Sequence, residues 1–456
     1  MAKGATKDMT VGSPMKLILG FSVPLLFGFL FQQFYNVVDT IIVGRFLGME
    51  ALAGVGATGS VNFLILGFCM GLCSGFAIPV AHKFGAKDYS GMRQVIANCM
   101  WLCIGFSVVF TLIVSLLCKQ ILIWMQTPED MFTYSYTYIL IIFLGIPATI
   151  LYNMLSGIIR SMGDSKTPLF FLVISSLLNI GLDLLFILNF QMGVAGAAVA
   201  TVSSQLISGI LCLFYMIKRY EILHITGEEW KINFQYMKML CSAGLPMGLQ
   251  YSITAIGSVI LQAAVNTLGS VAVAAITAGG KVCIFLGCAF DAMGTTMATY
   301  AGQNVGAEKL DRLNKGLRDC LLLGAVYSVF SFSTIYFFGM DLVSLFVDQP
   351  DAQMLAYAKM YLLIVSATHM LLAIVNIVRY TIQGMGFSGL AIFAGVFEMI
   401  ARIVVAWIFV PKWGYLGACF ANPMAWIMAD AFLIPAYFYA KRKLQKRFKS
   451  DKRKAC

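Results

Sequence analysis

Long apolar runs follow one another along the whole of this 456-residue chain. A helix that crosses a bilayer needs roughly 20 apolar residues, and twelve runs reach about that length. The strands of a membrane β-barrel alternate in short segments instead. We therefore predict an all-α integral membrane protein with twelve transmembrane helices, near residues 16–44, 52–80, 94–118, 132–158, 168–189, 194–217, 238–267, 272–300, 316–339, 355–382, 390–410 and 415–440.

Composition agrees with a membrane protein. The chain is 60% hydrophobic and 12% charged, with a mean hydropathy of +0.84, which is too apolar for a soluble domain of this size. The N-terminus is polar and the first apolar run is too long for a cleaved signal peptide. We expect the first run to be a permanent span.

The two halves of the sequence resemble each other at intervals of about 222 residues. LGMEALAGVGA at 47–57 corresponds to LGSVAVAAITA at 268–278, and GVAGAAVA at 193–200 corresponds to GYLGACFA at 414–421. Pro24 and Pro246 lie at matching places in the preceding spans. Membrane proteins built from two similar halves are typically transporters, with a substrate path between the halves.

Basic residues predict the orientation. With a cytoplasmic N-terminus and alternating spans, the inside segments hold 26 of the 32 Lys and Arg residues, Arg379 among them. The outside segments hold Arg45, Lys119, Lys359 and Lys412. This asymmetry satisfies the positive-inside rule, so both termini are expected to be cytoplasmic.

The net charge of +11 arises largely from the C-terminal tail, which holds nine basic residues after Ala440. Such a cluster favours anionic lipid headgroups. An RNA-binding role would need aromatic residues between the charges, so we expect no nucleic-acid partner.

Several enzyme signatures are missing from the sequence. Two cysteine pairs, Cys69/Cys73 and Cys99/Cys103, have i,i+4 spacing, but cysteine also packs between helices as a small hydrophobe, and we favour packing over metal binding. No phosphate-binding G-x-x-x-x-G-K motif is present, and no nucleophile–base signature stands out. We predict that the protein is not an enzyme and has no cofactor.

Ionisable residues within the spans are the functional candidates, because they are costly in a bilayer. They are Asp39, Asp183, Asp291, Glu398, Asp430, Lys281 and Arg402. Glu398 and Arg402 are four residues apart and are predicted to be a structural ion pair. Asp430 has no basic residue at i±3 or i±4, and we expect it to face a polar crevice.

Two of these acids belong to polar stripes. Asp39 ends the stripe Gln32–Tyr35–Asp39, and Asp183 ends the stripe Ser176–Asn179–Asp183, both with i, i+3, i+7 spacing. Each stripe occupies one helical face. Two carboxylates on facing helices would suit a hard cation such as Na⁺ or hold a proton. The other interpretation is that each aspartate caps a kinked backbone or bonds a neighbouring helix.

A family resemblance rests on these motifs. QQFYNVVDTIIVGRFLG at 32–48, the GAKD and GAEK loops, RSMGDSKTP at 160–168, NIGLD at 179–183 and GVAGAAVAT at 193–201 are similar to the multidrug and toxic compound extrusion (MATE) family. The resemblance implies two pseudo-symmetric six-helix lobes around a central cavity. The lobes would span 1–217 and 238–440, with a cytoplasmic linker at 218–237 and a basic tail at 441–456.

The resemblance also implies a cation-coupling site in the N-terminal lobe. Its residues fall here on Tyr35, Asp39, Asn153, Asn179, Asp183 and Thr201. A Na⁺ ion would be held by Asp39, Asn179, Asp183 and Thr201. One branch of the family uses a glutamate on the seventh helix, but 238–267 contains no acid, so we expect coupling to rest on the N-terminal lobe.

The expected activity is secondary active export of organic, mainly cationic drugs, coupled to H⁺ or Na⁺ by alternating access. Pro24 is either a hinge or a static kink. The candidates for the substrate cavity are Phe31, Phe63, Met70, Met247, Phe285, Asp291 and Met293. Asp291 is either the counter-ion of a cationic drug or the partner of Lys281 or Arg402.

Three other functions stay open. One is a flippase for lipid-linked oligosaccharides from the same superfamily, although only Lys281 and Arg402 are basic within the spans. A second is an integral-membrane enzyme, for which no metal cluster or nucleophile is found. A third is a non-transporting sensor, although the longest internal hydrophilic stretch is only about 218–237. The expected setting is the cytoplasmic membrane of a bacterium, with a monomeric protein and the lipid bilayer as its environment.

Overall fold

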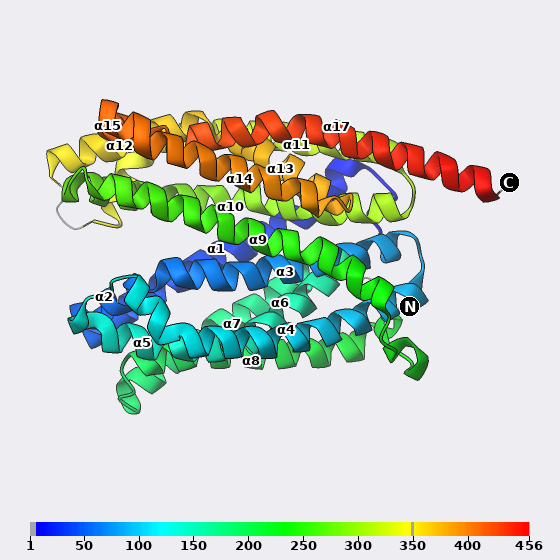
Figure 1. The fold of residues 1–456 in the computed structure, drawn as a ribbon, viewed down its shortest axis with the longest axis horizontal. Helices are drawn as coiled ribbons and strands as arrows, with labels where there is room; N and C mark the ends of the chain where they lie inside the picture. The colour runs from blue at the N-terminus through cyan, green and yellow to red at the C-terminus, as the bar shows by residue number, and fades with distance from the viewer. Residues whose placement is uncertain (1–5, 348–350, 456) are drawn as a thin grey trace. The chain divides into compact units, whose positions relative to one another are not determined.

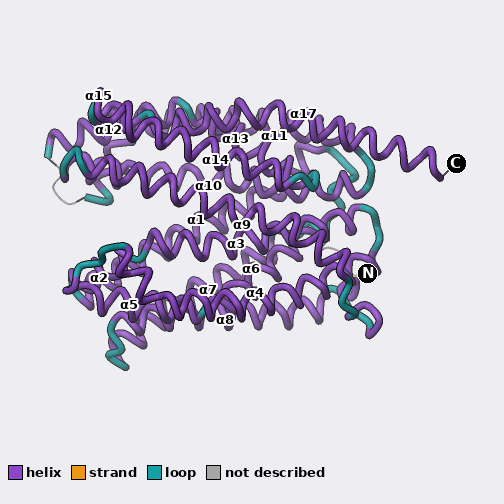
Figure 2. The backbone as a smooth tube through the Cα atoms, viewed as in Figure 1, coloured by secondary structure: helices purple, strands orange, loops and turns teal. Residues whose placement is uncertain are grey.

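The computed structural model describes residues 6–347 and 351–455, and all regular structure in these ranges is helical (Figures 1 and 2). In chain order the elements are α1 (Pro14–Leu47), α2 (Met49–Ala57), α3 (Gly59–Gly85), α4 (Tyr89–Trp124), α5 (Glu129–Leu144), α6 (Ile146–Ser161), α7 (Lys166–Leu184), η1 (Leu185–Asn189), α8 (Val194–Arg219), η2 (Glu221–Leu223), η3 (Gly227–Trp230), α9 (Phe234–Asn266), α10 (Ser270–Gly306), α11 (Leu310–Ser344), α12 (Ala352–Ala367), α13 (His369–Gly384), α14 (Ser388–Val404), η4 (Val405–Phe409), α15 (Val410–Trp413), α16 (Tyr415–Cys419) and α17 (Ala421–Ala455).

The predicted spans are found in the described residues. Ten helices are long and apolar enough to cross a membrane, and two bent pairs bring the number to twelve if each pair is one span. The pairs are α5–α6, bent by 46°, and α12–α13, bent by 48°. Each pair coincides with one predicted span, 132–158 or 355–382. The all-α membrane fold is therefore confirmed.

The internal repeat is also visible in the backbone. Lys87 and Glu308, in the GAKD and GAEK loops, have positive φ angles of 59° and 56°. Positive-φ glycines recur as the pairs Gly48/Gly269, Gly163/Gly386 and Gly193/Gly414. A π-helical turn follows both α7 and α14. The same backbone conformation therefore recurs at matching places in the two halves.

The chain divides into two compact units. The first unit contains Phe27–Gly248 and the residues before Met9; the second contains Met9–Leu26 and everything from Leu249 onward. The divisions fall two residues after Pro24 in α1 and two residues after Pro246 in α9. The first part of each of these helices thus belongs to the other half's unit. The lobe boundaries at 217 and 238 do not include this exchange and stay a prediction.

Each unit has its own apolar core. In the first unit, buried residues of α3, α4, α5 and α6 pack together, among them Leu72, Phe76 and Phe143. In the second, residues of α10, α12, α13 and α17 do the same. Lipid is as apolar as these side chains, so close van der Waals packing, aided by small residues, holds such helices together.

One close helix approach in the first unit depends on glycine. A Cβ atom added to Gly75 of α3 would lie 2.4 Å from the Cα of Gly244 and 2.6 Å from the carbonyl oxygen of Ala243, both on α9. These are backbone atoms, which cannot turn away as a side chain can. Gly75 therefore allows α3 and the first part of α9 to touch backbone to backbone.

Gly75→Ala is expected to destabilise the protein by about 1–3 kcal/mol, because it overpacks this contact. Gly105→Ala on α4 is the matched control: nothing lies within 4 Å of its added Cβ, and alanine favours a helix over glycine by about 1 kcal/mol. Thermal unfolding of the purified protein in detergent measures both. Equal melting temperatures for the two variants would contradict the close contact.

The segment between α8 and α9 is docked onto α4. The carboxylate of Glu229 in η3 accepts hydrogen bonds from Arg93 Nε at 2.8 and 2.9 Å, from Ser90 Oγ at 3.0 Å and from the backbone N–H of Thr226 at 2.9 Å. The donors, Arg93 first, lower the pKa of Glu229 to about 2. Asn98 of α4 also accepts from the N–H of Asn233 at 2.8 Å.

The depressed pKa of Glu229 gives a pH-dependent stability. Its contribution is fully present above the ordinary value of 4.5 and is lost as the pH falls through about 2. Glu229→Gln should therefore lower the melting temperature by a constant amount above about pH 5, and the gap to the wild type should close below that pH. Thermal unfolding across pH measures the gap. A gap that widens in acid would be incompatible with this pairing.

Candidate functional site

The two polar stripes lie within the first unit. Tyr35 and Asp39 belong to the part of α1 after Leu26, and Asn179 and Asp183 belong to α7. Their i, i+3, i+7 spacing keeps each stripe on one helical face. The two acids differ in exposure: Asp39 is partly buried, whereas the side chain of Asp183 is fully buried at 0% exposed.

The side chains of Asp39 and Asp183 interact electrostatically with each other. Three of their oxygens are buried and have no hydrogen-bond partner among the described residues. They are Oδ1 of Asp39 and both carboxylate oxygens of Asp183. No ion pair within this part of the chain involves either acid. Two adjacent ionised carboxylates without a positive partner are unstable in a buried place. The arrangement can therefore hold a cation, either a proton or a metal ion with oxygen ligands.

Asn179 and Thr201 form a second part of this site. Asn179 Nδ2 donates to Thr201 Oγ1 at 3.4 Å, and its buried Oδ1 has no partner among the described residues. Thr201 Oγ1 in turn donates to the carbonyl of Ala197 at 3.1 Å. Asn179 lies four residues before Asp183 on α7. The orphaned Oδ1 is a further neutral oxygen on the face that carries the carboxylate.

The other two predicted members are placed differently. Tyr35 interacts electrostatically with Asp39 and so lies beside the carboxylate pair. Asn153 donates to the carbonyl of Thr149 on its own helix at 2.8 Å. The structure thus relates Tyr35, Asp39 and Asp183 to one another and Asn179 to Thr201, whereas the contact seen for Asn153 stays within α6.

Sequence reasoning did not identify Tyr138 of α5. Its side chain is 7% exposed, and it interacts electrostatically with Asp39, Asp183 and Tyr35. The segment has tyrosines at 134, 136 and 138, and helical spacing alone does not say which of them faces α1 and α7. A phenol in this position could donate to a carboxylate or supply an oxygen to a cation.

The predicted substrate residues are divided between the units. Phe31 and Phe63 of the first unit are 44% and 49% exposed, whereas Met247 of that unit is buried at 1%. Met70 is partly buried there, and Phe285 and Met293 are partly buried in the second unit. Asp291 of α10 is exposed and accepts a hydrogen bond from Asn376 Nδ2 at 3.0 Å. The assignment of these residues to a cavity stays a prediction.

Arg379 does not lie where the charge pattern placed it. It was assigned to a cytoplasmic segment, but it is 8% exposed within α13 and donates to Glu398 Oε1 at 3.1 Å. The predicted Glu398–Arg402 pair exists at 3.9 Å and is longer than the Arg379 contact. The second unit thus buries a further arginine near the predicted counter-ion Asp291, on which Arg379 acts.

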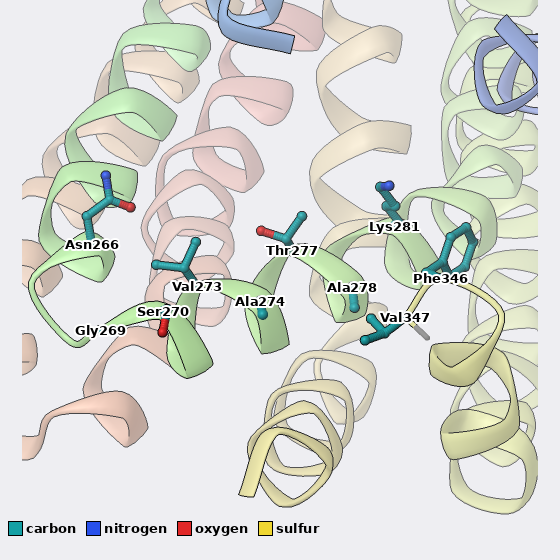
Figure 3. A pocket seen from close by; sticks show the side chains of 10 residues that line it. All are labelled: Asn266, Gly269, Ser270, Val273, Ala274, Thr277, Ala278, Lys281, Phe346 and Val347. Atoms are coloured by element: carbon teal, nitrogen blue, oxygen red, sulfur yellow. The ribbon is translucent and has the colours of Figure 1, made fainter. Parts of the chain in front are cut away.

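Lys281 belongs to a separate cavity of about 510 Å³, lined by residues at the end of α9, in the first turns of α10 and just after the end of α11 (Figure 3). Its ammonium lies 5.6 Å from the ring centroid of Phe346. No ion pair in the described part of the chain joins Asp291 to Lys281 or Arg402, the two partners considered as the alternative to a drug. The four cysteines of the helical pairs lie in the core of the first unit as free thiols, and no group of three His, Cys, Asp or Glu that could hold a metal occurs in the described residues.

Comparisons with known proteins agree with this picture. A family model described as MatE matches the chain twice, over residues 24–185 and 246–408. The "Probable multidrug resistance protein YpnP" of Bacillus subtilis (strain 168) is 30% identical, over 78% of this chain and 79% of its own length. "Probable multidrug resistance protein YoeA" of the same strain is 28% identical over 80% of each chain. A solved structure titled "Crystal structure of MATE in complex with MaL6" has a TM-score of 0.90 and 22% identity, and covers 98% of this chain and 100% of its own. The chain therefore belongs to the multidrug and toxic compound extrusion (MATE) family of multi-pass membrane transporters.

Proposed function

We propose that this protein exports organic, mainly cationic compounds by antiport against H⁺ or Na⁺. The observation that carries the proposal is the Asp39–Asp183 pair, whose buried oxygens have no hydrogen-bond partner among the described residues. The names of relatives, which include probable multidrug resistance proteins, support drug export. The relatives and the matching folds are transporters rather than enzymes.

The coupling ion neutralises the carboxylate pair. With the site empty, two like charges repel each other across α1 and α7; a cation removes this repulsion and lets the helices pack more closely. Pro24 removes an i→i−4 hydrogen bond from α1, and α1 passes from one unit to the other two residues later. Repacking of α1 at this point is the step that links ion binding to alternating access.

The oxygens suit either ion. A proton would be shared between Asp39 and Asp183, with Tyr35 and Tyr138 beside them. A Na⁺ ion would draw on the carboxylates, the free Oδ1 of Asn179 and the hydroxyl of Thr201, which are the hard oxygen ligands it prefers. The residues present fit both cations.

The substrate class follows from the exposed acid of the second unit. As an exposed acid, Asp291 is a counter-ion for an organic cation. The protein works as a monomer in the cytoplasmic membrane of a bacterium, with both termini in the cytoplasm.

Dye transport in proteoliposomes tests the proposal. A cationic dye such as ethidium and a neutral dye are followed without ATP, under an imposed pH gradient and, separately, an imposed Na⁺ gradient. One of the two gradients should drive the cationic dye, and the neutral dye should move more slowly or not at all. If neither gradient moves the cationic dye above the rate of protein-free liposomes, the proposed export fails.

A further inference from the structure

In the second unit, α13 packs against α10, α14 and α17, and α14 packs against α17. These four helices carry a cluster of charges. Its members are Asp291, Arg379, Glu398, Arg402 and Asp430, and we call it the second-unit charge cluster. The last four are between 3% and 8% exposed, whereas Asp291 is exposed. The proposed coupling at Asp39 and Asp183 makes no use of this cluster.

Glu398 forms ion pairs with both arginines of the cluster. Glu398 Oε1 accepts from Arg379 at 3.1 Å, and Glu398 Oε2 lies 3.9 Å from Arg402. Arg379 also donates to Asn376 Oδ1 at 3.0 Å, and Asn376 Nδ2 donates to Asp291 Oδ1 at 3.0 Å. A chain of contacts therefore runs from Glu398 through Arg379 and Asn376 to Asp291.

Asp430 stands outside this chain of contacts. It is 5% exposed, and neither of its carboxylate oxygens has a hydrogen-bond partner among the described residues. Arg379 and Glu398 are near enough to act on it, with opposite signs. An ionised carboxylate in such a place would lack both water and donors, which is far more costly than burying the neutral acid. The group avoids that cost by binding a proton.

The charge of the cluster changes with this proton. With Asp430 neutral, Asp291 and Glu398 balance Arg379 and Arg402. With Asp430 ionised, the cluster has one negative charge in excess, and a cation bound at Asp291 would restore neutrality. Arg379 strengthens the exchange, because its buried Nε has no partner in the described residues and is a free donor for an ionised Asp430.

From this arrangement we infer that Asp430 is a second proton-binding site, which releases its proton when an organic cation binds at Asp291. The inference rests on the proposed function only for the identity of the ligand at Asp291. Because linkage is reciprocal, proton binding at Asp430 weakens binding of the organic cation by the same factor. The proton passes to water, and no other bond is made or broken.

Two further titratable groups lie on helices that pack against α17. His369 of α13 hydrogen-bonds with Ser331 Oγ at 2.8 Å and lies 6.2 Å, ring to ring, from Trp426, one turn before Asp430. Lys359 of α12, a helix that also packs against α17, is exposed. Histidine ordinarily changes its charge near neutral pH, so His369 needs its own control variant.

Infrared spectroscopy of the purified protein tests the proton directly. A protonated carboxylic acid and a carboxylate absorb at different infrared frequencies. The spectrum of the wild type minus that of Asp430→Asn, both at about pH 7, should therefore show the band of a protonated acid. Asp430→Asn should fold with little loss of stability, because it replaces one neutral group by another. His369→Gln should keep the band. A difference spectrum that contains only carboxylate bands would overturn the inference, whether or not any ligand binds.

Proton release on binding of tetraphenylphosphonium tests the exchange. The double variant Asp39→Asn/Asp183→Asn removes the proposed site of the first unit, and it should still release about one proton per ligand into weak buffer. Addition of Asp430→Asn should abolish that release and remove a roughly tenfold change in affinity per pH unit. Undiminished release would overturn the exchange. If the wild type transports no dye but the double variant still releases a proton on binding tetraphenylphosphonium, the proposed export fails while the proton site at Asp430 stands.

Discussion

Asp183→Asn is expected to reduce gradient-driven dye efflux to the rate of protein-free liposomes. The side chain is 0% exposed, and its two oxygens lack a partner among the described residues. An amide has the same shape but cannot be ionised, so the site can neither release a proton nor attract Na⁺ with a full charge. Asp39→Asn should have the same effect, because the two carboxylates act as one site.

Asp341→Asn is the matched control for these variants, since Asp341 is an exposed acid near the end of α11. It should transport dye like the wild type. Melting temperatures of all three variants show whether they are folded. Transport at the wild-type rate by a folded Asp183→Asn protein would remove the carboxylate pair from the mechanism.

Glu398→Gln is expected to give the largest loss of stability, about 3–5 kcal/mol. Arg379 and Arg402 are 8% and 7% exposed, and Glu398 is the carboxylate that both contact. The substitution leaves two buried guanidinium groups without that partner. A thiol-reactive dye can follow unfolding, because most of the free cysteines are buried in the native state.

Glu228→Gln provides the comparison, because Glu228 pairs with Lys231 on the surface, where the side chains are 82% and 72% exposed. Such a pair contributes about 0–1 kcal/mol. Combining Glu398→Gln with Asp430→Asn removes both buried acids near Arg379, so the double variant should lose more stability than the sum of the single ones. Similar melting temperatures for Glu398→Gln and Glu228→Gln would contradict the buried network.

The spans could be predicted from sequence because each apolar run must satisfy its backbone within one helix. The bends within two of them could not. Gly145 separates α5 from α6, and an added Cβ there would lie 2.2 Å from Val202 Cγ2 of α8, a constraint that only the packed structure reveals. The equivalent bend follows Ala367 at Thr368, with neither glycine nor proline to mark it.

The candidate site was partly within reach of the sequence. Helical spacing placed Asp39 and Asp183 on polar faces, but their proximity depends on how α1 packs against α7, 144 positions along the chain. Tyr138 comes from a third helix and has no distinctive spacing. Arg379 lies five residues before the end of α13, so a rule that assigns basic residues near span ends to the cytoplasm misplaced it.

Counter-transport tests the central claim most directly. Proteoliposomes are loaded with ethidium and diluted into dye-free medium, without any imposed ion gradient, while internal pH and internal Na⁺ are recorded. Antiport predicts that outward movement of ethidium draws H⁺ or Na⁺ inward, and that Asp183→Asn abolishes the movement of both. Protein-dependent ethidium efflux with no opposite flux of either ion would contradict cation-coupled antiport.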